Sequence, residues 1–416
     1  MKQFRTLLFI LVFTPLTVMA QGDVEINAEN FPDSNFRNYL LAQRYGEDGV
    51  ISSYEIESII MISVDSLNIS SLKGIENFVA LQNLYCNFNQ LTSLDLSQNS
   101  ALTNLSCVTN QLSELDLSHN ASLTGLSCND NQLKTLNVSN CAALTNISCT
   151  GNQLTTLDVS SCAALTTLYL GYNQLTTLDI SNCTALINLS CGNNQLMTLD
   201  VSNCTALTYL ECMANQLTTL DVSRNVALTS LYCEDNQLKT LDVSENKELM
   251  LLYCGKNQLT SLDVSQNPNL IWMSCYYNQL TSLDVSKSPT LNWLRCSHNM
   301  IKGASMDALV ESLTTNVTAE EYSLCVYDNT DNDEGNVCTK TQVAVAKSKG
   351  WTPKYYTGTE WLAYEGSDED PSSIVLPNIE ANDVNTPIYD LSGKRVNNLE
   401  GKKGIYIIDG KKMLKK

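Results

Sequence analysis

The sequence predicts a parallel β solenoid of 21-residue turns, with a helical N-terminal cap, an α/β C-terminal cap and a small β tail. Residues 144–164, LTNISCTGNQLTTLDVSSCAA, recur with small changes over more than half of the chain. Their triplet Asn-Gln-Leu returns every 21 residues, and a fixed period of this length is the signature of stacked structural repeats. The asparagines that open the triplet, with the edited Asn-Met-Ile as the last, are Asn89, Asn110, Asn131, Asn152, Asn173, Asn194, Asn215, Asn236, Asn257, Asn278 and Asn299.

The first half of each turn follows the pattern L-x-x-L-x-C-x-x-N-x-L, and the second half repeats it in shortened form. The chain therefore resembles a bacterial leucine-rich repeat protein, of the secreted Bacteroidetes type with nested 21-residue repeats. The resemblance covers residues 59–302. It implies a solenoid that offers an extended face of strands to a binding partner.

The N-terminus carries a targeting pattern over residues 1–20. Lys2 and Arg5 precede the apolar run 7–13, which is typical of a cleavable signal peptide. The alternative, a transmembrane anchor, needs about 20 apolar residues, and Pro15 interrupts this run. We therefore expect an exported chain, on the outer surface or extracellular, with no transmembrane span after cleavage.

Residues 21–58 are expected to cap the first turn with two helices, around 35–43 and from Ser52 onward. The turn between the helices resembles half of a calcium-binding EF-hand loop, but Arg44 and Gly46 stand at its first and third ligand positions. A cation at the first ligand position disfavours calcium, so we expect a helix-turn-helix cap. The positions that do match the loop are Asp48, Gly49, Ile51, Ser52 and Glu55.

The 16 cysteines follow the repeat rather than a disulfide pattern. One set occupies a single phase of the turn, where Leu170 replaces Cys once, so the thiol there fills the core. A second set alternates with Asn in the second half of the turn. Stacked parallel side chains suit neither disulfide geometry nor, without His, a metal ladder, and we expect buried free thiols. Outside the ladder, Cys325 and Cys338 are candidates for pairing with each other. The first set is Cys86, Cys107, Cys128, Cys149, Cys191, Cys212, Cys233, Cys254, Cys275 and Cys296, and the second is Cys141, Cys162, Cys183 and Cys204.

Side chains at the third, fifth, seventh and eighth positions of each turn are expected to point away from the core. In early turns these are small or amide residues, whereas later turns carry aromatic and charged residues that adjacent turns would bring into one patch. Trp, Tyr and Arg dominate binding hot spots, although scattered aromatics are also common on strands. The candidate ligand-binding residues are Tyr209, Glu211, Tyr232, Glu234, Asp235, Tyr253, Lys256, Trp272, Tyr276, Tyr277, Trp293, Arg295 and His298.

An aspartate ladder runs through the second half of the turns, with Asn137 at its one uncharged rung. Like charges at strand spacing repel each other, so we expect the Ser or Thr two residues earlier, such as Thr156 before Asp158, to donate hydrogen bonds. Structural calcium is the alternative. The ladder comprises Asp95, Asp116, Asp158, Asp179, Asp200, Asp221, Asp242, Asp263 and Asp284.

The repeat pattern ends at Gly303, and residues 303–365 are expected to form an α/β cap. Apolar spacing predicts a helix from Met306 to Leu313, alternation predicts strands over 322–327 and 351–356, and Thr339 opens a second helix with a capping box. The acidic loop 328–336 could hold calcium but is more simply a solvated loop. Residues 366–386 are acidic, contain Pro and Ser, and are expected to be a linker.

The tail, residues 387–416, resembles the C-terminal sorting domain of type IX secretion. The resemblance lies in the motif formed by Asp390, Gly393 and Lys394, and in the later pair Gly404 and Tyr406. It implies surface delivery by that route, whereas a small β module that only caps the chain is the alternative.

Composition excludes several functions. A net charge of −19 argues against nucleic-acid binding, which requires stripes of Lys and Arg. The two histidines lie far apart, and no nucleophile or phosphate-loop motif is present, so no enzyme activity and no cofactor are expected. We therefore expect a surface protein that binds a protein partner through its strands. A glycan-binding module that uses the later Tyr and Trp residues, or a spacer without a ligand, are the alternatives.

Overall fold

The computed structural model describes residues 22–316, 321–328, 334–368, 388–390, 395–396, 404–408 and 411–415. The expected signal peptide, most of the expected linker, and Gly393 and Lys394 lie outside these residues. The chain divides into two compact units, Met1–Gln237 and Leu238–Lys416, and each is described by itself.

The first unit begins with a helical cap. Strand β1 (Val24–Glu25) pairs antiparallel with β2 (Val50–Ile51), and α1 (Ser34–Leu41) and α2 (Ser53–Ser58) follow β1 and β2 respectively. Ser52 and Glu55 form a capping box on α2, so the carboxylate that matched the last EF-hand position binds backbone instead. The two helices expected from the sequence are therefore present, and the turn between them closes a helical cap.

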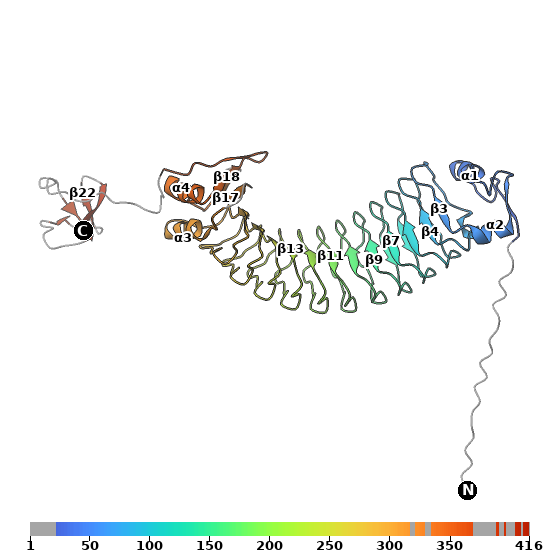
Figure 1. Ribbon diagram of the computed structural model, residues 1–416, viewed down its shortest axis with the longest axis horizontal. Helices are drawn as coiled ribbons and strands as arrows, with labels where there is room; N and C mark the ends of the chain where they lie inside the picture. The colour runs from blue at the N-terminus through green and yellow to red at the C-terminus, as the bar shows by residue number, and fades with distance from the viewer. Residues whose placement is uncertain are drawn as a thin grey trace, which may run out of the picture. The chain divides into compact units, whose positions relative to one another are not determined.

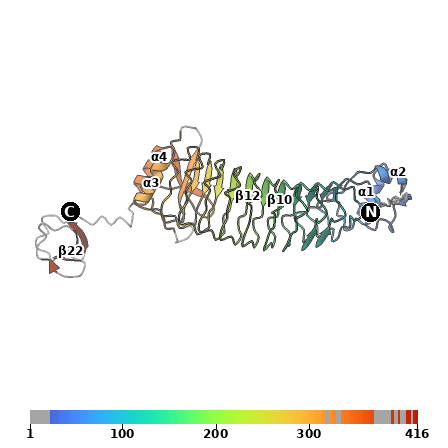
Figure 2. The same ribbon diagram turned by 90° about the horizontal axis from the view of Figure 1, so that it is seen from below.

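The solenoid of the first unit is a parallel sheet in which each strand pairs with the strand 21 residues later (Figure 1). Strands are three residues long with a buried middle residue, because the first-half pattern places one Leu, Ile or Met between two outward residues. Seen from below, β10 and β12 lie one turn apart (Figure 2). The strands are β3 (Met61–Ser63), β4 (Asn83–Tyr85), β5 (Asn104–Ser106), β7 (Gly125–Ser127), β9 (Asn146–Ser148), β10 (Thr167–Tyr169), β11 (Asn188–Ser190), β12 (Tyr209–Glu211) and β13 (Ser230–Tyr232).

The second half of the turns is mostly irregular. A short helix, η1 (Ile75–Asn77), lies in the opening turn, and β6 (Glu114–Asp116) pairs in parallel with β8 (Thr135–Asn137). The residues between these elements turn the chain back toward the next strand of the main sheet.

The triplet asparagines are buried and join each turn to the previous one. Asn152 Oδ1 accepts a hydrogen bond from Leu133 N at 2.9 Å, and its Nδ2 donates to the carbonyls of Cys128 and Cys149, both at 3.0 Å. This satisfies backbone groups that the turn would otherwise bury unpaired. The triplet asparagine is therefore structural.

All 16 cysteines are buried free thiols, as the repeat phase predicted. The tentative pairing of Cys325 with Cys338 is wrong, because both are free. In the second set, the Cys141 Sγ donates to the carbonyls of Leu117 and Asn120 at 3.2 and 3.6 Å. Asn120 Nδ2 makes the corresponding pair of bonds one turn earlier. Asn and Cys alternate at this position because both can donate to the turn before.

The aspartate ladder is stabilised differently from the sequence-based expectation. Asp158 Oδ1 accepts from Ser160 N at 2.9 Å, so its partner lies two residues later and not at Thr156. The hydrogen bonds from the side chain and backbone of Ser160 lower the pKa of the Asp158 carboxyl. The geometry is a local turn in which the side chain of Asp binds the backbone two residues ahead. Each aspartate is thereby held by its own turn, whatever its neighbours in the ladder.

The second unit continues the same pattern into the C-terminal cap. Strands β14 (Leu251–Tyr253), β15 (Trp272–Ser274), β16 (Trp293–Arg295), β17 (Tyr322–Asp328) and β18 (Trp351–Tyr356) are parallel neighbours, and β19 (Trp361–Ala363) pairs antiparallel with β18. Helices α3 (Ala304–Ser312) and α4 (Lys340–Ser348) contact each other. The expected capping box of Thr339 and Gln342 is present. The α/β cap is thus confirmed, with β19 as an additional strand.

The tail forms a separate antiparallel sheet in the order β21-β20-β22-β23. Its strands are β20 (Ile388–Tyr389), β21 (Arg395–Val396), β22 (Gly404–Ile408) and β23 (Lys411–Lys415). Asp390 follows β20, while Gly404 and Tyr406 belong to β22. A β tail is therefore confirmed as a fold element.

Candidate functional site

The β face of each unit is the surface formed by the outward residues of strands β3 to β16. In the first unit it carries Tyr209 and Tyr232, whose ring centroids lie 5.5 Å apart. Glu211 accepts a hydrogen bond from Ser190 Oγ on the neighbouring strand. Burial, followed by the nearby Glu211 charge, raises the pKa of Tyr209 to about 12. Farther along each turn, Glu234 is half-buried and Asp235 is exposed.

In the second unit, three aromatic residues on adjacent strands form what we call the Trp293 cluster. Tyr253 stacks on Trp293 with centroids 6.1 Å apart, and Trp272 lies 6.4 Å from Trp293. The 21-residue register brings the three rings together, as the sequence predicted. Trp272 remains 46% exposed, so the cluster offers a large apolar surface to solvent.

Arg295 and Tyr276 lie on the same face but are occupied by the C-terminal cap. The guanidinium of Arg295 lies 3.8 Å from the ring centroid of Tyr276 and forms an ion pair with Asp328 at 3.2 Å. The rings of Tyr356 and Trp361 also lie within 6 Å of it. Arg295 therefore holds the cap to the last repeat turns, and is a weaker candidate for ligand contact than the sequence indicated.

His298 is buried, which corrects the expectation that it faces outward. Its ring stacks on Tyr277 with centroids 3.8 Å apart, and Nε2 lies 3.8 Å from Asp328 Oδ2. Its backbone N–H donates to both oxygens of Glu334 at 2.9 Å. The cap segment that carries Glu334 covers this turn, which repeat periodicity could not reveal. Lys256, at the same repeat position as His298, is exposed.

Glu334 organises the junction between the last turn and the cap. Besides His298, its carboxylate accepts from the backbone N–H groups of Asp328 at 3.0 Å and Asn336 at 2.9 Å. Burial raises the pKa of Glu334 to about 7. The junction is therefore a buried charged network that supports the fold.

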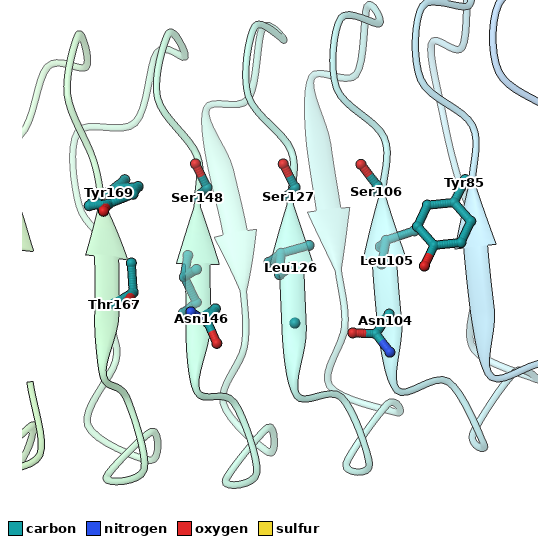
Figure 3. A pocket seen from close by; sticks show the side chains of 12 residues that line it. Tyr85, Asn104, Leu105, Ser106, Leu126, Ser127, Asn146, Ser148, Thr167 and Tyr169 are labelled. Carbon is teal, nitrogen blue, oxygen red and sulfur yellow. The ribbon is translucent and has the colours of Figure 1, made fainter. Parts of the chain in front are cut away.

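A shallow trough on the β face of the first unit was missed by the sequence analysis. It has a volume of about 430 Å³ and crosses strands β4, β5, β7, β9 and β10 (Figure 3). Tyr85 and Tyr169 stand at its two ends, and small polar residues lie between them. The signal in the sequence was this pair of tyrosines at the same repeat position, four turns apart, with serines in the intervening turns. The residues between them in rows are Asn104, Ser106, Gly125, Ser127, Asn146, Ser148 and Thr167.

Two further searches bear on chemistry. Within the described residues, no group of three or more His, Cys, Asp or Glu side chains is placed to hold a metal ion. No helix among the same residues is long and apolar enough to cross a membrane.

No family model matches the chain. Internalin J of Listeria monocytogenes is 31% identical over 85 residues, which is 20% of this chain and 9% of that protein. The solved functional domain of internalin J, described as including a cysteine ladder, has a TM-score of 0.60 at 23% identity over 96% of this chain and 100% of that one.

Two other solved structures show the same architecture. An internalin (inlF) of the same species has a TM-score of 0.68 at 23% identity, covering 83% of this chain and 100% of that chain. A leucine-rich repeat protein of Leptospira interrogans has a TM-score of 0.50 at 26% identity, covering 58% of this chain and 72% of that chain. The chain therefore has the leucine-rich repeat solenoid fold, and internalins of Listeria monocytogenes are among the structures that it resembles.

Proposed function

We propose that this chain is an exported bacterial recognition protein that binds a protein partner through the β face of its second unit. The observation that carries the proposal is the Trp293 cluster. Trp and Tyr are the residues most enriched in binding hot spots, and an exposed aromatic group framed by polar residues is typical of an interaction surface. The resemblance to internalins, which share the solenoid, supports a recognition role.

The cluster is also prepared for binding. Tyr253, Trp272 and Trp293 pack on one another and stand on strands of a continuous parallel ladder. Rings fixed in this way lose little conformational freedom when a partner docks, and that raises affinity. Arg295 and Tyr276, held by the cap, would form the border of this surface.

The test compares binding of the full chain and of a Trp272→Ala/Trp293→Ala variant to an array of extracellular host proteins. Loss of two hot-spot residues should weaken binding to a genuine partner by at least about 4 kcal/mol, or roughly a thousandfold. Tyr54→Ala is the matched control, because Tyr54 is 80% exposed on helix α2 and outside the β face. Retained binding in the tryptophan variant would refute the proposal, and binding to glycans alone would favour the glycan alternative.

Export and surface delivery are part of the same proposal. Residues 1–20 have the pattern of a signal peptide, and the strands of the tail contain Asp390, Gly404 and Tyr406 of the sorting-like motif. Deleting residues 387–416 should leave the solenoid folded and remove the protein from the surface of intact cells. A truncated protein that still reaches the surface would contradict the sorting role.

A further inference from the structure

The trough between Tyr85 and Tyr169 is uncharged on the surface of an acidic protein. None of its twelve lining residues is Asp, Glu, Lys, Arg or His, whereas the chain as a whole carries a net charge of −19. An ionic ligand would find no opposite charge there to repay its loss of hydration. The lining favours a ligand that is polar and neutral.

The polar groups in the trough repeat along one direction. Parallel strands lie about 4.8 Å apart, so residues at one repeat position recur with that step across the sheet. Ser106, Ser127 and Ser148 form one such row between the two tyrosines. One step is close to the length of a pyranose ring in an extended sugar chain, so successive sugars would meet equivalent groups.

The hydrogen-bonding groups of the floor are already oriented. Ser106 Oγ donates to Asn87 Oδ1 at 2.7 Å, and Ser148 Oγ donates to Asn129 Oδ1 at 2.8 Å. The serine oxygens therefore present lone pairs to the trough. A floor whose donors and acceptors are fixed in advance binds a hydroxyl-rich ligand with a small entropic cost.

The ends of the trough add apolar surface. Tyr85 on β4 and Tyr169 on β10 occupy the same position of their turns, and Figure 3 shows their rings at opposite ends of the row. The interval of four strand spacings is roughly 19 Å, which is room for about four pyranose rings. A tyrosine offers both a ring face for the C–H groups of a sugar and a hydroxyl for its oxygens.

An extended peptide is a poorer fit. Peptides that bind sheets usually do so by pairing with free backbone groups at an edge. In the trough, strands β5, β7 and β9 are paired on both sides, with β5 between β4 and β7 and β9 between β7 and β10. A peptide would have to bind through side chains alone.

We propose that this trough binds a neutral oligosaccharide, laid across strands β4, β5, β7, β9 and β10 with its terminal sugars against Tyr85 and Tyr169. The site is distinct from the Trp293 cluster and does not depend on it. The chain would then carry a glycan subsite in its first unit in addition to the proposed protein-binding surface of its second unit.

The test is calorimetric titration of the full chain with chitotetraose, cellotetraose and maltotetraose, and with an anionic heparin tetrasaccharide. At least one neutral sugar should bind, with an affinity that changes little with salt because no charge takes part. Tyr85→Ala/Tyr169→Ala should weaken that binding at least about tenfold. Gly125→Tyr should abolish it by placing a ring mid-trough, and the fold accepts this residue because Tyr209 occupies the same repeat position.

Two controls separate this site from other effects. Tyr172→Ala removes a tyrosine that is 63% exposed but does not line the trough, and Ala214 already occupies its repeat position, so sugar binding should be unchanged. Trp272→Ala/Trp293→Ala should also leave sugar binding intact, so failure of the proposed function is distinguishable. The proposal is overturned if no neutral sugar binds, if binding survives both trough variants, or if only the anionic sugar or a neutral peptide binds.

Discussion

The side-chain oxygen of Asn152 lies 2.9 Å from the backbone nitrogen of Leu133, 19 residues earlier in the chain. The same bond recurs one turn away, between Asn131 and Leu112, and again between Asn173 and Leu154. Each bond joins two successive turns through a buried side chain. The stability of the solenoid therefore depends on a repeated contact between neighbours.

Asn152→Ala should destabilise the protein by about 3 to 5 kcal/mol, because it leaves a buried N–H group and two buried carbonyls with fewer partners. Asn152→Asp should be similarly damaging, since a carboxylate oxygen would face the carbonyls of Cys128 and Cys149. Chemical denaturation followed by circular dichroism measures both. Asn140→Ala, which removes an exposed hydrogen bond to Ser118, is the control and should cost much less. Equal losses for Asn140 and Asn152 would contradict this account.

Asn120→Cys should leave stability within about 1 kcal/mol of the wild type. The thiol can make the two bonds that Cys141 makes one turn later, and the change removes the buried Asn120 Oδ1, which has no hydrogen-bond partner. Asn120→Leu, which keeps bulk but removes the donor, should be clearly more destabilising. If both substitutions cost the same, the donor function assigned to the cysteine is wrong.

The native protein should not react with a water-soluble thiol reagent at pH 8. Burial raises the pKa of Cys107 to about 12, and the other thiols are buried as well, so the reactive thiolate is scarce and inaccessible. Denaturation without a reductant should expose all 16 thiols to titration. A substantially lower number after denaturation would mean that disulfides exist.

The stability of the second unit should fall as pH rises from about 4.5 to 7 through the titration of Glu334. Its folded pKa is raised to about 7, so the folded state binds more protons than the unfolded state in this window. Stability is then lost on deprotonation, by up to about 3 kcal/mol. Urea unfolding monitored by tryptophan fluorescence reports on this unit, because all four tryptophans lie in it.

The Glu334→Gln variant should lack this component of the pH dependence, whatever its stability at a single pH. Glu245→Gln, at an exposed glutamate of the same unit, should keep the wild-type slope. A wild-type slope in the Glu334 variant would show that another group is responsible.

The solenoid was predictable from the sequence because each turn is covered by turns of the same kind. Periodicity alone therefore indicated that Leu168 and Cys149 are core residues, and both are fully buried. The same reasoning failed at His298, because its neighbour on one side is the cap. Asn336 shows the difficulty well.

Asn336 takes the place of the next triplet asparagine, although no triplet surrounds it. Its Oδ1 accepts from Ile301 N at 2.8 Å and its Nδ2 donates to the carbonyl of Cys296 at 2.8 Å, the two bonds that a further turn would supply. It lies 37 residues after Asn299, so a 21-residue period could not find it. The trough escaped detection for a related reason, since its shape arises from small residues that carry no signal singly.

The bonds of the triplet asparagines also determine how such a chain can change length. Removing or duplicating one whole turn leaves every remaining asparagine opposite an equivalent Leu N–H group and Cys carbonyl. Near-identical coding segments recombine readily, so the gene can gain or lose turns in steps of 21 codons while both caps keep their contacts. A row of substituents such as Tyr85 and Tyr169 would be lengthened or shortened in the same discrete steps, which makes the span of a ligand site a heritable, countable quantity.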